Sequence, residues 1–173
     1  MNVLAEFKKV TTFVFDIDGV LTDSAVFCME NGLQARRMNV KDGLGLQMAM
    51  KNGFRVLAVS GGFSEPVIQR LKKLGLEEVH MSVMNKKQFI SDYMKNNKLG
   101  WDEILYMADD LPDLDLMNAV GLPCCPADAV PEILEASKYI SPVNGGFGCV
   151  RDVIEKVLKV QDKWIYHQDV ISK

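Results

Sequence analysis

The stretch FVFDIDGVLTD, residues 13–23, joins an apolar run to a group of aspartates. Its apolar start predicts a buried strand, because a short apolar run bounded by turn residues is typical of one. The run ends in two aspartates one residue apart, Asp16 and Asp18. Two carboxylates side by side at the end of a buried strand indicate a chemical site rather than an ordinary turn.

Strand-like and helix-like segments alternate along the rest of the chain. Buried strands are predicted at residues 11–15, 54–60, 79–83, 103–108 and 121–126, with a short one at 138–141. Helical patterns lie between them, and Asp42 and Ser64 are candidate caps for two of the helices. This alternation predicts a doubly wound, Rossmann-like α/β fold whose parallel sheet is covered by helices on both faces.

Segment 25–38 departs from this alternation. It predicts a β-hairpin in which AVFCM and LQARRM flank the turn ENG. The 173 residues suffice for one domain with a full core. We therefore expect a single domain over residues 1–173, with a C-terminal tail at about 161–173.

Composition argues against several classes of protein. The net charge of −3 is unlike that of a nucleic-acid-binding surface, which normally carries a basic patch. The sequence has no run of roughly 20 apolar residues that would span a membrane. The N-terminus MNVLAEFKKV lacks the apolar run of a signal peptide. We expect a cytoplasmic protein without a nucleic-acid or membrane partner.

Polar residues follow the predicted strands at four places. They are Asp16 with Asp18, Ser60 with Gly61 and Gly62, Lys86 after Asn85, and Asp109 with Asp110 and Asp113. In doubly wound sheets, sites lie beyond the carboxyl ends of the strands, so these groups should meet at one edge. Several aspartates at one edge need a cation, and oxygen ligands without Cys or His favour Mg²⁺.

The same groups suit a phosphate ester. Ser60, Lys86 and the backbone N–H groups of Gly61 and Gly62 can bind phosphate oxygens. Asp16 can attack phosphorus and form an aspartyl-phosphate. Asp18 can protonate the leaving oxygen and then deprotonate the attacking water.

These residues resemble a known family. The segments DIDGVLTD and ADDLPD, together with Ser60 and Lys86, look like the four motifs of the haloacid dehalogenase-like (HAD) phosphatases, over roughly residues 9–160. The resemblance implies that Asp16 is the nucleophile and Asp18 the acid/base. It also implies an Mg²⁺ ion held by the Asp16 side chain, the Asp18 backbone carbonyl and the Asp109 side chain.

Two further aspartates have implied roles, and one position departs from the family pattern. By the resemblance, Asp110 and Asp113 support the metal and Lys86. Family members usually have Gly-Asp-Asp in the last motif, whereas this chain has Ala108 before the two aspartates. We expect the extra methyl group to be tolerated.

The spacing of the motifs leaves no room for a cap domain. A hairpin and one helix fill the gap between Asp18 and Ser60, and one helix and one strand fill the gap to Lys86. The hairpin resembles that of the capless, tetrameric branch acting on sugar-acid phosphates, in which hairpins of four subunits screen the active sites. The resemblance therefore implies a homotetramer.

Three other segments narrow the resemblance. Lys41-Asp42-Gly43, the run GLPCCPADAVPEI and the stretch NGGFGCVRDVIEKVL are similar to the 3-deoxy-D-manno-octulosonate 8-phosphate (KDO 8-phosphate) phosphatases, which serve lipopolysaccharide biosynthesis. A sister group that acts on nine-carbon sugar acids, such as KDN 9-phosphate, resembles the chain nearly as well. It tends to carry glutamate where this chain has Gly62, which favours the eight-carbon acid.

Two loop features bear on the substrate. The eight-carbon group commonly has an arginine in the loop where Phe63 stands here. Arg70 and Lys73 match positions that reach a sugar carboxylate, in the same or a neighbouring subunit. The alternative for both cations is a solvated helix face.

Two other classes of protein use similar residues, and the order of the motifs argues against the first of them. A receiver domain also uses aspartates, a hydroxyl and a lysine, but its acidic pair precedes the phosphate-accepting aspartate, the reverse of the order here. A phosphatase-like scaffold without activity is a second alternative, with Ala108 and Phe63 as its signs. Lys87 is a rival to Lys86 for the lysine of the site.

Overall fold

The fold is built around a parallel β-sheet. The computed structural model describes residues 3–167 and 170. Within them the sheet has the strand order β5-β4-β1-β6-β7-β8. The strands are β1 (Thr12–Phe15), β4 (Arg55–Val59), β5 (Val79–His80), β6 (Ile104–Met107), β7 (Leu122–Cys125) and β8 (Tyr139–Ile140). All neighbours pair in parallel, which confirms the predicted doubly wound α/β fold.

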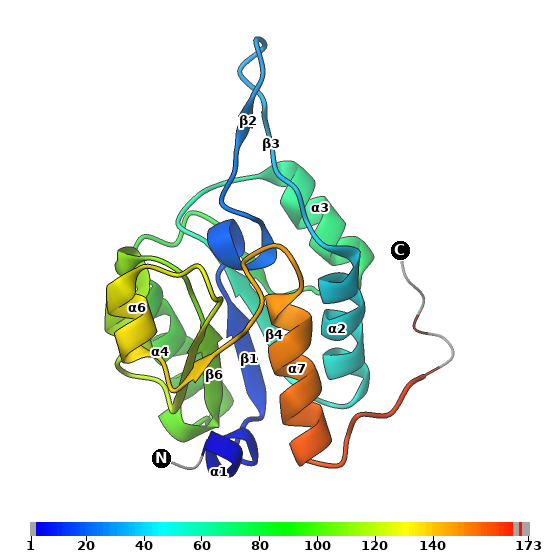
Figure 1. Ribbon diagram of the computed structural model, residues 1–173, viewed down its shortest axis with the longest axis vertical. Coiled ribbons are helices and arrows are strands. Elements are labelled where there is room, and N and C mark those ends of the chain that lie inside the picture. Colours follow the sequence, from blue (N-terminus) through cyan, green and yellow to red (C-terminus); the bar gives the residue numbers. More distant parts are fainter. Residues whose placement is uncertain (1–2, 168–169, 171–173) are drawn as a thin grey trace.

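Helices cover both faces of the sheet (Figure 1). They are α1 (Val3–Phe7), α2 (Val40–Lys51), α3 (Glu65–Lys73), α4 (Lys86–Asn97), α5 (Leu114–Met117), α6 (Pro131–Ala136) and α7 (Cys149–Val160). Short helical turns η1 (Ile17–Leu21), η2 (Trp101–Glu103) and η3 (Leu111–Asp113) complete the set. One cluster of buried side chains joins the sheet to α2, α3 and α7, and a second joins it to α4, α5 and α6.

The central strand β1 explains why both faces are apolar. Phe13 and Phe15 pack in the cluster with α2 and α7, whereas Val14 packs in the cluster with α4 and α5. All three side chains are fully buried. Successive side chains of a strand point to opposite faces, so a strand buried on both sides must be apolar at every position.

Strand order also locates the site. The order reverses at β1, because β4 and β5 lie on one side of it and β6, β7 and β8 on the other. Ligands of doubly wound sheets bind at the carboxyl ends of the strands beside such a reversal. The residues that follow β1, β4 and β6 are therefore brought together.

The predicted hairpin is present and projects well beyond the body of the molecule (Figure 1). Its paired strands are short, namely β2 (Phe27–Cys28) and β3 (Gln34–Ala35). Four of its apolar side chains are exposed: Val26, Phe27, Met29 and Leu33. Because these side chains are exposed, they contribute little packing within the chain. An isolated two-stranded hairpin is only marginally stable in water.

Asp42 does not cap α2, which corrects the expectation from the sequence. The helix begins earlier, and its cap is Asn39, whose side chain accepts the Lys41 N–H at 2.8 Å. Asp42 lies in the first turn and is buried. Its Oδ1 accepts the backbone N–H of Arg151 at 2.7 Å, in the first turn of α7. The carboxylate therefore joins the starts of two helices.

The start of the tail folds back onto the body. The Arg151 guanidinium lies 4.5 Å from the ring centre of Trp164, and the Asn52 amide donates to the Ile165 carbonyl at 3.3 Å. Residues 168–169 and 171–173 of the expected tail lie outside the described part of the chain. Among the residues that are described, no helix is both long enough and apolar enough to cross a membrane.

Candidate active site

A cleft of about 490 Å³ opens at the carboxyl edge of the sheet. Its walls are Asp16, Asp18, Ser24, Ser60, Gly61, Gly62, Val83, Met84, Lys86, Asp109, Asp110, Pro112 and Asp113. These residues come from the segments that follow β1, β4, β5 and β6 and from the start of α4. The four places predicted from the sequence therefore meet at one cleft.

Asp16 lies directly after β1 and is nearly buried. Its backbone N–H donates to the Met107 carbonyl at 3.0 Å, which extends the pairing of β1 with β6 by one residue. Its Oδ1 accepts the N–H of Ile17 at 2.8 Å. Burial raises the pKa of Asp16 to about 7, although Lys86 opposes this rise.

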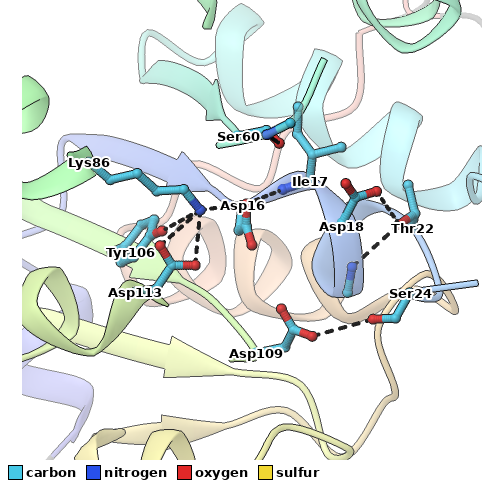
Figure 2. A network of polar contacts seen from close by, with 12 residues as sticks. Asp16, Ile17, Asp18, Thr22, Ser24, Ser60, Lys86, Tyr106, Asp109 and Asp113 are labelled. Carbon is cyan, nitrogen blue, oxygen red and sulfur yellow. Dashed lines mark hydrogen bonds and ion pairs between the residues drawn. The ribbon is translucent and has the colours of Figure 1, made fainter. Parts of the chain in front are cut away.

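Lys86 joins two aspartates across the cleft (Figure 2). Its Nζ lies 2.7 Å from Asp16 Oδ1 and 2.8 Å from Asp113 Oδ1. Tyr106, which is buried within β6, places its hydroxyl 3.4 Å from the same ammonium. Burial alone would lower the pKa of Lys86, but the two carboxylates raise it above its ordinary value. Lys86 is therefore held as a cation beside Asp16.

Asp109 packs against the backbone of the first loop. A Cβ atom built on Gly19 would lie 1.9 Å from Asp109 Oδ2, and Gly19 has a φ of 88°. Only glycine fits this close approach without displacing the carboxylate. Burial, together with the charge of Asp110, raises the pKa of Asp109 to about 6. The loop after β1 and the loop after β6 are therefore in close contact at Gly19 and Asp109.

A turn that contains Gly145 and Gly146 packs against the same loop. A Cβ atom on Gly145 would lie 1.9 Å from the Gly19 carbonyl oxygen. The Gly146 N–H donates to the Val20 carbonyl at 2.9 Å, and the Gly145 N–H donates to Asp128 Oδ1 at 2.9 Å. The NGGFG segment therefore holds the loop that carries Asp16 and Asp18.

Ser60 follows β4 and is buried at the cleft wall. Its backbone N–H donates to the His80 carbonyl at 2.9 Å, and its Oγ accepts the Gly62 N–H at 3.0 Å. Gly61 and Gly62 line the cleft beside it. This loop presents a hydroxyl and small residues to the cleft, as the sequence predicted.

Some candidate residues lie elsewhere in this chain. Arg70 lines a separate pocket between α3 and the hairpin base, and Lys73 is exposed on α3 without lining the cleft. Asp110 lines the cleft, but its side chain accepts the Leu111 N–H at 2.8 Å and so caps η3. Lys87, the rival lysine, is exposed and does not line the cleft.

Three residues of the site were not foreseen. Ser24 donates to Asp109 Oδ2 at 3.3 Å, and the Tyr106 hydroxyl lies 3.4 Å from Lys86 Nζ (Figure 2). Arg36, from the hairpin base, contacts Asp18. A buried tyrosine hydroxyl usually has a hydrogen-bond partner, but the sequence does not show which group it contacts. Nor does it show which of Arg36 and Arg37 turns inward. Only the β-strand alternation of these two arginines hinted that they face opposite ways.

The alanine that departs from the family pattern is accommodated without strain. Ala108 is fully buried, and its side chain packs in the apolar cluster with Val14 and Val59. Its N–H donates to the Cys124 carbonyl at 3.2 Å, and its φ is not positive. The extra methyl group therefore lies in the core rather than in the cleft.

A metal site at this cleft would use few side chains. Within residues 3–167 and 170, no group of three or more His, Cys, Asp or Glu side chains has the geometry of a metal site. A site built from two carboxylates and one backbone carbonyl does not require such a group. Asp16 and Asp109 both line the cleft, and burial raises the pKa of each. Burial raises these pKa values because it removes water from the charged carboxylates, and a cation between them would offset that cost.

Comparisons with known proteins agree with this geometry. No family model matches the chain. The 3-deoxy-D-manno-octulosonate 8-phosphate phosphatase KdsC of Escherichia coli K12 is 30% identical over 162 residues, covering 94% of this chain and 86% of the relative.

Two solved structures are similar over most of their length. A Moraxella catarrhalis 3-deoxy-D-manno-octulosonate 8-phosphate phosphatase, in complex with magnesium, phosphate and KDO, has a TM-score of 0.90 at 28% identity, covering 94% of this chain and 93% of that one. A cobalt-bound phosphatase of the same kind from Haemophilus influenzae has a TM-score of 0.86 at 28% identity, covering 91% and 92%. The chain therefore belongs to the 3-deoxy-D-manno-octulosonate 8-phosphate phosphatase family of the HAD superfamily.

Proposed function

We propose that this protein hydrolyses a sugar-acid phosphate through an aspartyl-phosphate on Asp16, with a divalent cation. One observation carries the proposal. The Lys86 ammonium lies 2.7 Å from Asp16 Oδ1, at the wall of a cleft that also holds Asp18, Ser60 and Asp109. A cation beside a buried carboxylate reduces the repulsion between that carboxylate and an incoming phosphate.

The reaction has two balanced halves. In the first, an Asp16 oxygen bonds to phosphorus while the bond from phosphorus to the sugar oxygen breaks, and Asp18 gives that oxygen its proton. In the second, water bonds to phosphorus, Asp18 takes a proton from the water, and the bond from phosphorus to Asp16 breaks. Asp18 thus ends in the protonation state in which it began, and inorganic phosphate and the free sugar acid leave.

The donor set favours Mg²⁺. The Asp16 side chain, the Asp18 backbone carbonyl and the Asp109 side chain would hold the cation, because hard oxygen ligands suit it. Asp110 and Asp113 would support the metal and Lys86. A bound divalent cation supplies positive charge to the phosphoryl oxygens. Activity should vanish in EDTA and return with added Mg²⁺.

The side of the cleft formed by Ser60, Gly61 and Gly62 would bind the phosphoryl oxygens. The Ser60 hydroxyl already accepts the Gly62 N–H at 3.0 Å, so its own proton is free to point toward a ligand oxygen. Arg70 and Lys73 would bind the sugar carboxylate. Because they lie away from the cleft in this chain, we assign them to the cleft of a neighbouring subunit.

The substrate is proposed to be KDO 8-phosphate, converted to KDO and phosphate for lipopolysaccharide biosynthesis in the cytoplasm. Relatives with this name cover nearly the whole chain, and the Moraxella relative binds KDO and phosphate. Gly62 favours this substrate over the nine-carbon KDN 9-phosphate or N-acylneuraminate 9-phosphate. Phe63 is exposed beside the hairpin rather than in the cleft, so it leaves the phosphate site unaltered.

We also propose that the single domain of residues 1–173 assembles into a homotetramer through its hairpins. The exposed apolar side chains at the hairpin tip support this, because a projecting apolar hairpin is typical of an interaction element. The cleft has no covering domain of its own within the described residues. Neighbouring subunits would close it.

The deciding experiment compares substrates. Phosphate release should be measured with Mg²⁺ on KDO 8-phosphate, KDN 9-phosphate, several simple sugar phosphates and p-nitrophenyl phosphate. We expect the highest kcat/KM for KDO 8-phosphate. A preference for the nine-carbon acid would move the substrate and keep the mechanism. No release together with no Mg²⁺ binding would favour the inactive scaffold.

Asp16→Asn is the matching variant. It keeps an oxygen for the Lys86 ammonium but removes the nucleophile, so turnover should be lost while circular dichroism is unchanged. Substantial residual turnover would remove Asp16 from the nucleophilic role.

A further inference from the structure

Arg36 is an arginine of the hairpin whose side chain is turned inward. It follows β3 directly, and its neighbours on the hairpin are exposed, yet its own side chain is only 9% exposed. Its Nε donates to Asp18 Oδ1 at 2.6 Å, and one terminal nitrogen donates to Asp18 Oδ2 at 3.4 Å. Such a charge-assisted contact strongly restricts the orientation of a carboxylate.

The two carboxylate oxygens of Asp18 have different hydrogen-bond partners. Oδ1 also lies 3.5 Å from the Thr22 hydroxyl, which donates to it (Figure 2). Among the residues that the structure describes, Oδ2 has only the 3.4 Å contact with Arg36, and it lies 3.7 Å from a Cβ atom built on Gly62. Oδ1 is therefore anchored, whereas Oδ2 faces the loop that lines the cleft.

The backbone around Arg36 is itself tied to the site. Ala35, just before it, pairs with Phe27 in the hairpin, and Met38, two residues after it, forms an antiparallel bridge with Thr22. The Arg36 backbone is thus fixed on both sides. The hairpin base and the loop that carries Asp18 form one connected unit.

We propose that Arg36 is a positioning residue that holds Asp18 Oδ1, so that Oδ2 exchanges the proton with the leaving oxygen and with water. This inference rests on the proposed function. The Arg36 guanidinium only donates hydrogen bonds to Asp18 and takes no part in the proton exchange. Oδ2 gives a proton to the sugar oxygen in the first half-reaction and takes one from water in the second. The hairpin is therefore a part of the active site within its own chain.

The test separates positioning from substrate binding. Arg36→Gln should lower kcat on KDO 8-phosphate by roughly tenfold to a hundredfold, since a positioned acid/base contributes about 10²–10⁴ in rate, and should change KM little. Arg36→Lys keeps the positive charge but loses the planar, two-pronged guanidinium, so its kcat should lie between that of wild type and that of Arg36→Gln. Arg55→Gln is the matched control, because Arg55 is exposed at the opposite end of the strands.

A second substrate gives a readout that a merely structural role would not move. The p-nitrophenolate leaving group needs no proton, so the first half-reaction should stay near the wild-type rate in Arg36→Gln. The second half-reaction still needs Asp18 as base and should slow. A rapid burst of p-nitrophenolate followed by slow turnover is the expected result.

The outcomes are distinguishable. A raised KM with unchanged kcat would make Arg36 a substrate ligand and overturn the proposal, as would wild-type kinetics for both variants. Thermal unfolding, compared with that of Arg55→Gln, shows whether Arg36→Gln folds. If it does not fold, Arg36→Lys is tested instead, by kcat and KM on KDO 8-phosphate and by the p-nitrophenolate burst. A wild-type protein inactive on every substrate would instead overturn the proposed function, and this inference with it.

Discussion

The Lys86 ammonium lies 2.7 Å from Asp16 Oδ1, although the two residues are 70 positions apart in the chain. Asp16 follows β1, where the strand order reverses, and Lys86 begins α4, which comes after the edge strand β5. Both side chains are about one-tenth exposed, so neither charge is well solvated. Lys86 is the cation for two carboxylates at once, because Asp113 Oδ1 lies 2.8 Å from the same ammonium.

Lys86→Gln should destabilise the fold and abolish activity. It leaves Asp16 and Asp113 buried near each other without a cation, and breaking a buried ion pair in this way costs roughly 3–5 kcal/mol of unfolding free energy. Urea unfolding and phosphate release measure the two effects. Lys87→Gln is the matched control and should behave as wild type. Equal effects of the two variants would contradict the assignment of Lys86.

Gly19→Ala should displace Asp109. The new Cβ would lie 1.9 Å from Asp109 Oδ2, so the carboxylate must move. We expect Mg²⁺ affinity and turnover each to fall by at least roughly a hundredfold. The positive φ at this position would also cost about 1–3 kcal/mol of stability. Gly53→Ala has the same kind of strain, with a φ of 85°, but its Cβ would have nothing within 4 Å. Isothermal titration with Mg²⁺ should therefore separate the two variants. Similar Mg²⁺ affinities would mean that the collision is relieved without moving Asp109.

Asp42→Asn should change how stability depends on pH. Burial raises the pKa of Asp42 from 3.8 to about 6 in the folded protein, with the Arg151 N–H opposing. A raised folded pKa means that the contribution of this group is complete below about pH 4 and is lost as pH rises through about 6. Wild type and Asp42→Asn should match near pH 4, and the variant should be the more stable at pH 7.

The measurement for Asp42 is urea unfolding of both proteins between pH 4 and pH 8. The difference should grow by at most roughly 3 kcal/mol, the free energy of a shift of about two pKa units. A variant that is less stable at pH 7 would show that the start of α7 stabilises the carboxylate as an anion.

Phe27→Ser combined with Leu33→Ser should weaken assembly without unfolding the body. Both side chains are more than 60% exposed on the projecting hairpin, so their loss costs no core packing. Light scattering should report a tetramer for wild type and smaller species for the variant. Leu4→Ser, on α1 at the other end of the molecule (Figure 1), is the control for an exposed apolar residue. A fully active wild-type monomer would contradict closure of the cleft by neighbouring subunits.

Much of this protein could be predicted from local sequence. The apolar runs placed the strands of the sheet, and the glycines and prolines marked most helix ends, because these signals depend on a few neighbouring residues. The helical segment between the strands predicted at 103–108 and 121–126 is only the short turn η3 followed by α5 (Leu114–Met117). Tertiary packing limits an element in ways that propensity does not express.

The motif residues were predictable because of where they occur along the chain. Asp16, Ser60, Lys86 and Asp109 each follow a strand, and a parallel sheet brings all such positions to one edge. Sequence order and the geometry of the sheet were together sufficient to assemble the cleft.

Fold class, strand ends and the acidic motif follow from the amino-acid sequence, since each depends on local pattern. Three contacts required the packed molecule: Arg36 rather than Arg37 meets Asp18, the Tyr106 hydroxyl contacts Lys86, and Asp42 joins α2 to α7 instead of capping its own helix. These contacts connect residues far apart in the chain, and their direction depends on how hairpin, sheet and helices pack. No local pattern encodes that direction.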